Sequence, residues 1–202
     1  MAVLGIPRFP ALNRLDEKLL TYLPLRGGVF VEAGANDGLS QSNTWFLEYY
    51  RGWSGLLVEP VPELFALAKK FRGAAVVNAA LGPRDGGTLR LWLRDLMTTS
   101  RIGNDVDSND IIEVPVRSLS SLLDDAGIET IDLFSLDVEG HEIPALSGLD
   151  FSRHRPKYIL VETSQLTAVS ELLARHYVLK DQFSYHDYLF EAKPITGEHA
   201  VN

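Results

Sequence analysis

The alternation of short apolar runs with amphipathic segments constrains the fold of this chain more than any other feature of its sequence. The apolar runs are rich in β-branched and aromatic residues, as buried strands are, and they cover residues 29–31, 55–58, 75–77, 131–136 and 158–161. The segments between them carry apolar residues at helical spacing and cover residues 63–72, 119–126, 142–149 and 167–176. Strands that alternate with helices predict an α/β fold, with a mostly parallel sheet and helices on both faces.

Four further strand-like runs extend this plan. Residues 177–180 and 188–191 predict an antiparallel pair that closes the sheet. Residues 88–93 and 111–116 predict an antiparallel insertion, and a polar loop over residues 94–110 separates its two strands. Loops of this length in compact domains are often lids or binding elements. We therefore expect residues 94–110 to border a ligand site and to order when the ligand binds, with an unstructured insertion as the alternative.

The length of 202 residues predicts one domain over residues 1–202. Residues 1–28 form its lead-in, with an amphipathic helix over residues 11–22 that ends before Pro24. Residues 29–191 form the core. Residues 192–202 are predicted to be a frayed tail.

Composition excludes several classes of function. The 19 Lys and Arg against 27 Asp and Glu leave a net charge of −8, which disfavours non-specific nucleic-acid binding and docking on anionic membranes. No cysteine is present, so disulfides, thiolate zinc sites and cysteine nucleophiles are excluded. Residues 1–10 lack the features of a signal peptide, and no apolar stretch is long enough to span a bilayer. We therefore expect a cytoplasmic protein.

The loop after the first core strand carries the strongest indication of a ligand. In open parallel sheets, ligands bind outside the carboxyl ends of the strands. This loop is Glu-Ala-Gly-Ala-Asn-Asp-Gly over residues 32–38, where Gly34 and Gly38 permit sharp turns and a close approach of backbone to ligand. Asn36 stands where the dinucleotide-binding fingerprint needs glycine, and Glu32 would repel a diphosphate. A cationic ligand such as S-adenosylmethionine suits the loop better, although an ordinary glycine turn is the alternative.

Polar residues also follow the other core strands. Glu59 ends the second strand, where an acid can accept hydrogen bonds from both ribose hydroxyls or can begin the next helix. Asn78 and Ala79 follow the third strand and would suit the edge and face of an adenine ring. Asp137 ends the fourth strand and is aimed into the crevice beside the first, and His141 follows it. These residues complete a predicted cofactor and catalytic site.

Taken together, these motifs resemble the FkbM-type methyltransferase family. The resemblance rests on the Gly-Ala-Asn-Asp-Gly loop at residues 34–38, Ser-Asn-Thr at residues 42–44, residues 52–60, and Asp-Val-Glu-Gly-x-Glu at residues 137–142. It covers Val29 to Glu191. It implies a Rossmann-like class I methyltransferase fold, S-adenosylmethionine as cofactor, and O-methylation of a hydroxyl on a sugar or secondary metabolite. His141 departs from the small or apolar residue expected at its position.

The resemblance assigns roles residue by residue. It places the cofactor loop at Glu32, Gly34, Asn36 and Gly38, the ribose acid at Glu59, and the strand-exit acid at Asp137. A sulfonium is already activated, so the protein has to position an acceptor hydroxyl and remove its proton. Asp137 and His141 are the candidate bases. A nicotinamide-dependent oxidoreductase and a non-catalytic nucleotide-binding protein on the same fold are the competing hypotheses.

A divalent metal such as magnesium is a further possibility for activating the hydroxyl. Asp137 and Glu162 end consecutive core strands, and both carboxylates would open into one crevice if those strands are neighbours. The placement resembles catechol O-methyltransferase, in which acids at the corresponding strand ends hold magnesium. Glu162 could instead begin the following helix. The expected partners are the cofactor and a small-molecule or glycan acceptor. We expect no binding to nucleic acid or to a membrane.

Overall fold

The computed structural model describes residues 5–23, 26–92 and 111–194, and its centre is a sheet of seven strands. The strand order is β3-β2-β1-β7-β8-β10-β9. In that order the strands span Ala75–Val77, Ser54–Val58, Val29–Ala33, Leu133–Leu136, Tyr158–Glu162, Asp187–Ala192 and Tyr177–Gln182. The first five are parallel to one another, and β10 is antiparallel to both β8 and β9. The predicted parallel core and the antiparallel closing pair are both confirmed.

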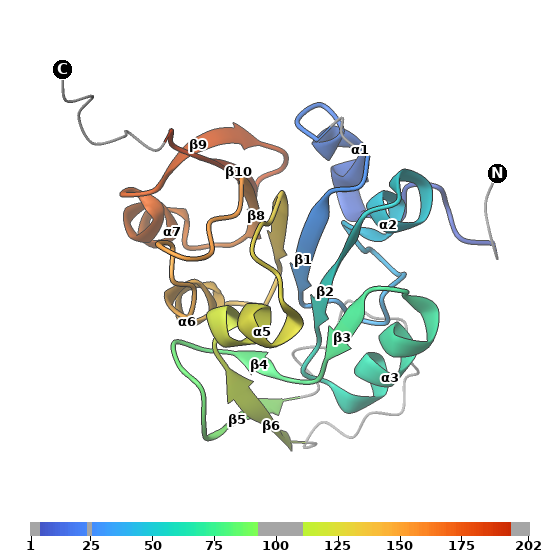
Figure 1. Cartoon of the computed structure of the whole chain (residues 1–202), viewed down its shortest axis with the longest axis vertical. Helices are drawn as coiled ribbons and strands as arrows, with labels where there is room; N and C mark the ends of the chain where they lie inside the picture. Colours follow the sequence, from blue (N-terminus) through green and yellow to red (C-terminus); the bar gives the residue numbers. More distant parts are fainter. Residues whose placement is uncertain (1–4, 24–25, 93–110, 195–202) are drawn as a thin grey trace.

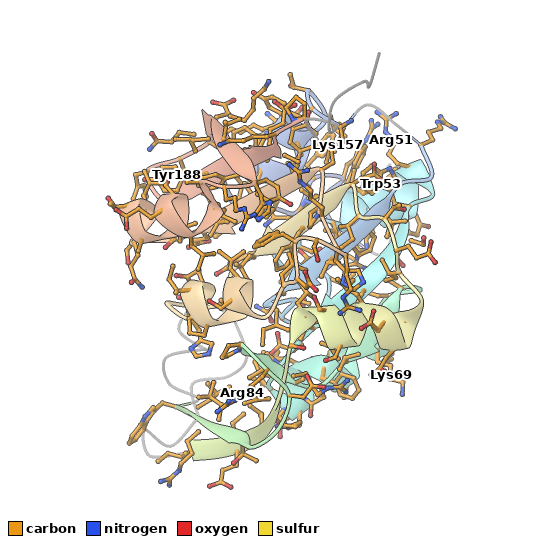
Figure 2. All side chains as sticks on the ribbon, turned by 60° about the vertical axis from the view of Figure 1, so that its left-hand side comes forward. Arg51, Trp53, Lys69, Arg84, Lys157 and Tyr188 are labelled. Atoms are coloured by element: carbon orange, nitrogen blue, oxygen red, sulfur yellow. The ribbon has the colours of Figure 1, made fainter. Side chains whose placement is uncertain are left out.

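Helices cover both faces of this sheet, as Figure 1 shows. On one face, α5 (Leu119–Ala126), α6 (Glu142–Ser147) and α7 (Leu166–Leu173) share a hydrophobic cluster with the sheet. On the other face, a second cluster joins the sheet to α1 (Leu15–Leu19), α2 (Trp45–Arg51) and α3 (Pro62–Phe71). Side chains fill the layers on both sides of the sheet (Figure 2). The sheet is therefore the middle of three layers.

The strand sequences explain this arrangement. Side chains alternate between the two faces of a strand, so Val31 and Ala33 pack in the first cluster and Phe30 packs in the second. A strand that is buried on both faces has no polar side and appears in the sequence as an unbroken apolar run. Glu32 has the same parity as Phe30 and is only 4% exposed. A buried carboxylate on this face has to find partners in the α2–α3 layer.

A smaller sheet lies beside the main one and has the order β4-β6-β5. Its strands are β4 (Ala80–Leu81), β5 (Thr88–Trp92) and β6 (Ile111–Arg117). β5 and β6 are antiparallel, as predicted for the insertion, and β4 adds a short parallel pairing to β6. The expected lid over residues 94–110 lies outside the described residues.

The predicted helix over residues 11–22 is wrong as a continuous element. A 3-10 turn (Leu12–Arg14) precedes the short α1, and Asn13 and Arg14 have positive φ angles of 50° and 56°. The buried carboxylate of Asp16 accepts hydrogen bonds from the backbone N–H groups of Ala11 and Glu17. A side chain that bonds to nearby backbone in this way competes with regular helix hydrogen bonds.

At the C-terminal end, the sheet extends one residue into the segment that the sequence assigns to the tail. β10 includes Ala192, whose backbone N–H donates to the carbonyl of Lys157, and Pro194 is also described. Residues 195–202 lie outside the described part of the chain. None of the helices that the structure describes is long and apolar enough to cross a membrane.

Candidate active site

The carboxyl ends of β1, β2 and β7 meet at a cavity. The backbone N–H of Gly34 donates to Val58 O at 3.0 Å, and that of Asp137 donates to Ala33 O at 3.0 Å, so three strand exits are joined at one place. The residues that line the cavity are Glu32–Asn36, Ser40–Asn43, Val58–Pro60, Leu64, Ala79–Leu81, Leu89, Leu91, Ser135, Asp137–Glu139 and His141. The cavity thus lies where parallel sheets of this kind bind their ligands.

The loop after β1 turns through three left-handed residues, Gly34, Asn36 and Gly38. Gly34 has φ +79°, and a Cβ atom built on it would lie 1.7 Å from the carbonyl oxygen of Asp137. Asn36 has φ +53°, and its backbone N–H donates to a carboxylate oxygen of Glu59 at 2.7 Å. Asp37 accepts from the N–H groups of Leu39 and Ser40 and thereby holds the far side of the turn. The side chains of Glu59 and Asp37 therefore hold the backbone of the loop in place.

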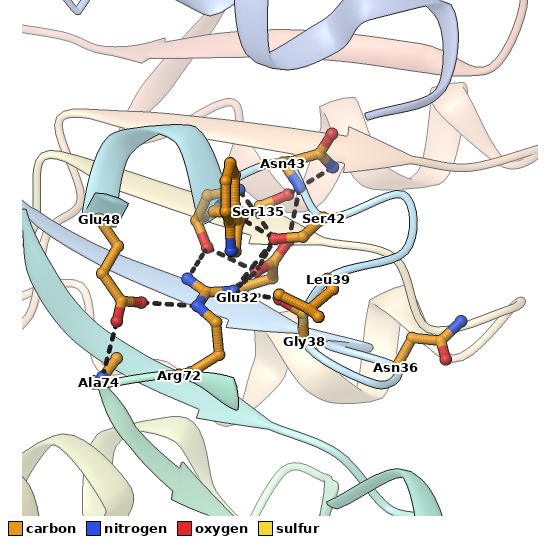
Figure 3. A network of polar contacts seen from close by, with 12 residues as sticks. Glu32, Asn36, Gly38, Leu39, Ser42, Asn43, Glu48, Arg72, Ala74 and Ser135 are labelled. Atoms are coloured by element: carbon orange, nitrogen blue, oxygen red, sulfur yellow. Dashed lines mark hydrogen bonds and ion pairs between the residues drawn. The ribbon is translucent and has the colours of Figure 1, made fainter. Parts of the chain in front are cut away.

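Glu32 is held by a buried polar network, drawn in Figure 3. Its carboxylate accepts from the backbone N–H of Asn43 at 2.7 Å and from the hydroxyls of Ser42 and Thr44 at 2.9 and 2.5 Å. The guanidinium of Arg72 lies 3.4 Å from the same carboxylate. These partners fix the carboxylate of Glu32 at the exit of β1, where Glu32 also lines the cavity.

Arg72 connects this network to three other parts of the chain (Figure 3). Its Nε donates to Glu48 at 2.6 Å, and its Nη atoms donate to Gly38 O at 2.9 Å and to Thr44 Oγ1 at 2.8 Å. The side chain of Arg72 is only 1% exposed. A buried guanidinium with this many acceptors ties α3, α2 and the loop after β1 to one another. Gly38 thus packs against Arg72 and is not among the cavity-lining residues.

Glu59, at the exit of β2, lines the cavity and is 4% exposed. One oxygen accepts from the N–H of Asn36 and the other from the N–H of Val61, at 2.7 and 2.9 Å. Burial raises the pKa of Glu59 to about 7, although these two hydrogen bonds oppose the shift. A carboxylate has about four acceptor positions, so two remain on Glu59.

Of the two residues expected at the adenine ring, Ala79 lines the cavity and Asn78 does not. The side-chain amide of Asn78 donates instead to the backbone carbonyls of Glu59 and Pro60.

Asp137, at the exit of β7, faces further acids. β7 and β8 are adjacent and parallel, and the carboxyl of Asp137 forms a hydrogen bond with that of Glu162. The pKa of Asp137 lies well above its usual range, first because of burial and then because of the charges of Glu162 and Glu139. The expectation that these strands are neighbours is confirmed, and the two carboxyls of the predicted metal site meet. Glu162 itself is not among the cavity-lining residues.

His141 and Glu142 follow at the start of α6. His141 lines the cavity. Glu142 is 1% exposed and accepts from the N–H of Gly140 and the hydroxyl of Thr163. Glu142 therefore orders the turn after β7. His141, Asp137 and Glu139 are the ionisable groups near this turn that line the cavity.

Sequence reasoning missed several cavity residues. The Nδ2 of Asn43 donates to Ser135 Oγ at 3.0 Å, whereas its Oδ1 is buried without a hydrogen-bond partner. Asn43 is the middle residue of Ser-Asn-Thr at residues 42–44, and the sequence alone gives this motif no role in the site. Leu89 and Leu91 also line the cavity, from the inserted strand β5. Their alternation along β5 was the available indication that one face of this insertion is covered.

Comparisons with known proteins agree with this geometry. The family model described as "Methyltransferase FkbM domain" matches residues 32–188. A methyltransferase FkbM from Methylobacillus flagellatus is 17% identical with a TM-score of 0.54, and the match covers 82% of this chain and 43% of that chain. The comparison with curated proteins found no match.

Two further solved structures have TM-scores above 0.5. A precorrin-6y C5,15-methyltransferase from Geobacter metallireducens is 14% identical with a TM-score of 0.53, covering 93% of this chain and 98% of that chain. A TehB-like SAM-dependent methyltransferase from Corynebacterium glutamicum is 15% identical with a TM-score of 0.51, covering 89% and 88%. At these identities the likeness shows the fold, which is that of class I methyltransferases.

Proposed function

Since this chain belongs to the methyltransferase FkbM domain family, we propose that it transfers the methyl group of S-adenosylmethionine to a hydroxyl oxygen of a sugar or secondary metabolite. The family is one of S-adenosylmethionine-dependent enzymes. The observation that carries the proposal is the cavity that Gly34, Glu59 and Asp137 line together at the carboxyl ends of three strands. A positioned cofactor and a positioned base are what methyl transfer to an alcohol needs from a protein.

The lining fits the cofactor. Glu59 has two acceptor positions left for the ribose hydroxyls. The unpartnered Oδ1 of Asn43 is suited to a donor such as the ammonium group of the methionine part. Ala79, Leu81 and Leu89 offer apolar surface for the adenine ring. In this arrangement Glu32, Gly34 and Asn36 line the side of the cavity that faces the cofactor, Gly34 and Asn36 with their backbone.

When bound, the cofactor supplies a methyl group on sulfonium, which needs no further activation. The chain has to exclude water, hold the acceptor oxygen in line with that methyl group, and accept the hydroxyl proton. Asp137 is the preferred base because it lines the cavity at the exit of the central strand β7. His141 is the second candidate base, and a divalent cation between Asp137 and Glu162 is the alternative way to activate the hydroxyl.

We expect Glu59→Ala to weaken binding of S-adenosylhomocysteine by about 1–3 kcal/mol, because a charged hydrogen-bond acceptor is lost. Calorimetry on the folded variant measures this, with Glu63→Ala, an exposed acid on α3, as the matched control. Equal affinity of Glu59→Ala and the wild-type protein would remove Glu59 from the ribose site. Tight binding of reduced nicotinamide cofactor in the same assay would instead favour the oxidoreductase hypothesis.

The affinity for S-adenosylhomocysteine should also depend on pH. The pKa of Glu59 is about 7, and its ionised form is the one that accepts two hydroxyl hydrogen bonds. Affinity should therefore be constant above about pH 8 and fall as the pH drops through 7, by no more than the loss expected for Glu59→Ala. Glu59→Gln cannot ionise and should have a flat profile over this range. The same slope in Glu59→Gln would assign the pH dependence to another group.

Asp137→Asn should lower kcat by about 10²–10⁴, the usual contribution of a general base. Turnover is measured on an acceptor found by screening hydroxyl-bearing sugars and secondary metabolites, and affinity for S-adenosylhomocysteine should be retained. His141→Gln is the companion variant, and a loss of kcat there with activity kept in Asp137→Asn would make His141 the base. Full turnover in excess chelator would exclude a cation between Asp137 and Glu162.

A further inference from the structure

Glu162, His186 and Asp187 form a cluster of ligand-type side chains beside the proposed active site. Glu162 ends β8 and Asp187 begins β10, and the two residues are paired directly across the antiparallel strands. His186 precedes Asp187, and its Nε2 lies 3.4 Å from Glu162 Oε1 and 3.7 Å from Asp187 Oδ2. One nitrogen or oxygen atom from each residue lies within 4.8 Å of the others. Three such atoms are close enough to share one cation.

The charge around this cluster is strongly negative. Asp137, on the neighbouring strand β7, forms a hydrogen bond with Glu162, and Glu139 follows two residues later. In the described part of the chain, the ion pairs of Glu162 and Asp187 are made with His186 alone, and neither acid has a lysine or arginine partner. Four acids thus face a single imidazole. A divalent cation would compensate this charge more completely than an imidazolium does.

The backbone and a neighbouring hydroxyl hold the cluster in place. Asp187 is 2% exposed, and its strand lies between β8 and β9 in the sheet. Ser184 Oγ donates to Asp187 Oδ2 at 2.5 Å, and the N–H groups of His186 and Asp187 both contact the same hydroxyl. Support of this kind orients the carboxylate that a metal would bind and is typical of metal sites.

We propose that Glu162, His186 and Asp187 bind a divalent transition-metal cation such as Mn²⁺ or Zn²⁺. One imidazole and two carboxylates form a mixed nitrogen and oxygen set, which favours these ions over Ca²⁺ or Mg²⁺. The set shares only Glu162 with the pair of acids expected from the sequence. It contains none of the residues proposed to contact the cofactor, so metal binding can be measured without cofactor or acceptor.

The test is calorimetry with MnCl₂ on the tag-free full chain after removal of metals with a chelator. We expect one Mn²⁺ per chain. His186→Gln should weaken Mn²⁺ binding by at least tenfold, whereas Glu63→Gln, at an exposed acid on α3 outside the cluster, should change it less than threefold. Circular dichroism and unchanged affinity for S-adenosylhomocysteine establish that His186→Gln is folded. The partly exposed ring of His186 makes this variant safer than one at the buried Asp187.

Two results would overturn the assignment. The first is the absence of saturable binding of either Mn²⁺ or Zn²⁺ to the wild-type chain. The second is binding that survives His186→Gln but is lost in Asp137→Asn, which would move the cation to the pair Asp137 and Glu162. Neither result depends on finding the methyl acceptor.

Discussion

Gly34→Ala is expected to abolish the cofactor site and to lower the free energy of unfolding by at least about 3 kcal/mol. The new Cβ would lie 1.7 Å from the backbone carbonyl oxygen of Asp137. In addition, Gly34 has a backbone φ of +79°, which residues with a side chain rarely adopt. Backbone cannot move aside as a flexible side chain can. The loop after β1 would therefore have to move away from the exit of β7. These two segments form opposite sides of the cavity, so the cavity would lose its shape.

Urea denaturation and calorimetry with S-adenosylhomocysteine measure the two effects. Gly52→Ala is the matched control, since Gly52 has a similar φ of +67° but nothing within 4 Å of its built Cβ. It should cost only about 1–2 kcal/mol, the usual penalty of the left-handed conformation, and leave affinity unchanged. Similar losses in the two variants would mean that backbone strain, and not the contact with Asp137, dominates at Gly34.

Arg72→Met is expected to lower the free energy of unfolding by about 3–5 kcal/mol. The substitution keeps much of the volume but removes the cation that faces Glu32 and Glu48. The side chain of Glu32 is 5% exposed, so water cannot replace the lost charge. Equilibrium urea denaturation, followed by circular dichroism, is the measurement.

The double variant Glu32→Gln with Arg72→Met separates the charge from the packing. It should be more stable than Arg72→Met alone, because the uncompensated carboxylate has gone. Arg90→Ala serves as the surface control: Arg90 and its partner Glu113 are 68% and 61% exposed, and the change should be within about 0.5 kcal/mol. Additive effects of Glu32→Gln and Arg72→Met would show that the two residues are not energetically coupled.

The local sequence pattern predicts the position of a residue wherever that position depends on a single strand or helix. The apolar runs at residues 29–31 and 158–161 are buried on both faces of the sheet, and only a strand in the middle of three layers needs such a run. α5 occupies Leu119–Ala126 as its helical spacing predicts. Gly34 and Asp137 were placed at the crevice because parallel strands bring their carboxyl ends to one edge.

Contacts between elements distant in the sequence were decided by the tertiary structure. Arg72 looks like the basic end of an amphipathic helix, yet packing places it under the loop after β1, 40 residues away from its partner Glu32. Glu32 belongs to the glycine loop in the sequence, and only the fold brings Ser42, Asn43 and Thr44 to its carboxylate. No periodicity within one segment carries information about such pairs.

The sequence by itself determined the α/β class, the closing antiparallel pair and the loop at which the family is recognised, because strand and helix periodicity and glycine turns are local properties. The tertiary structure alone decided which acids face one another. Glu162 and Asp187 become neighbours through the antiparallel register of β8 and β10, and His186 joins them because it precedes the strand. Strand order and register depend on packing across the whole sheet, which is why this cluster cannot be seen in the sequence of any one strand.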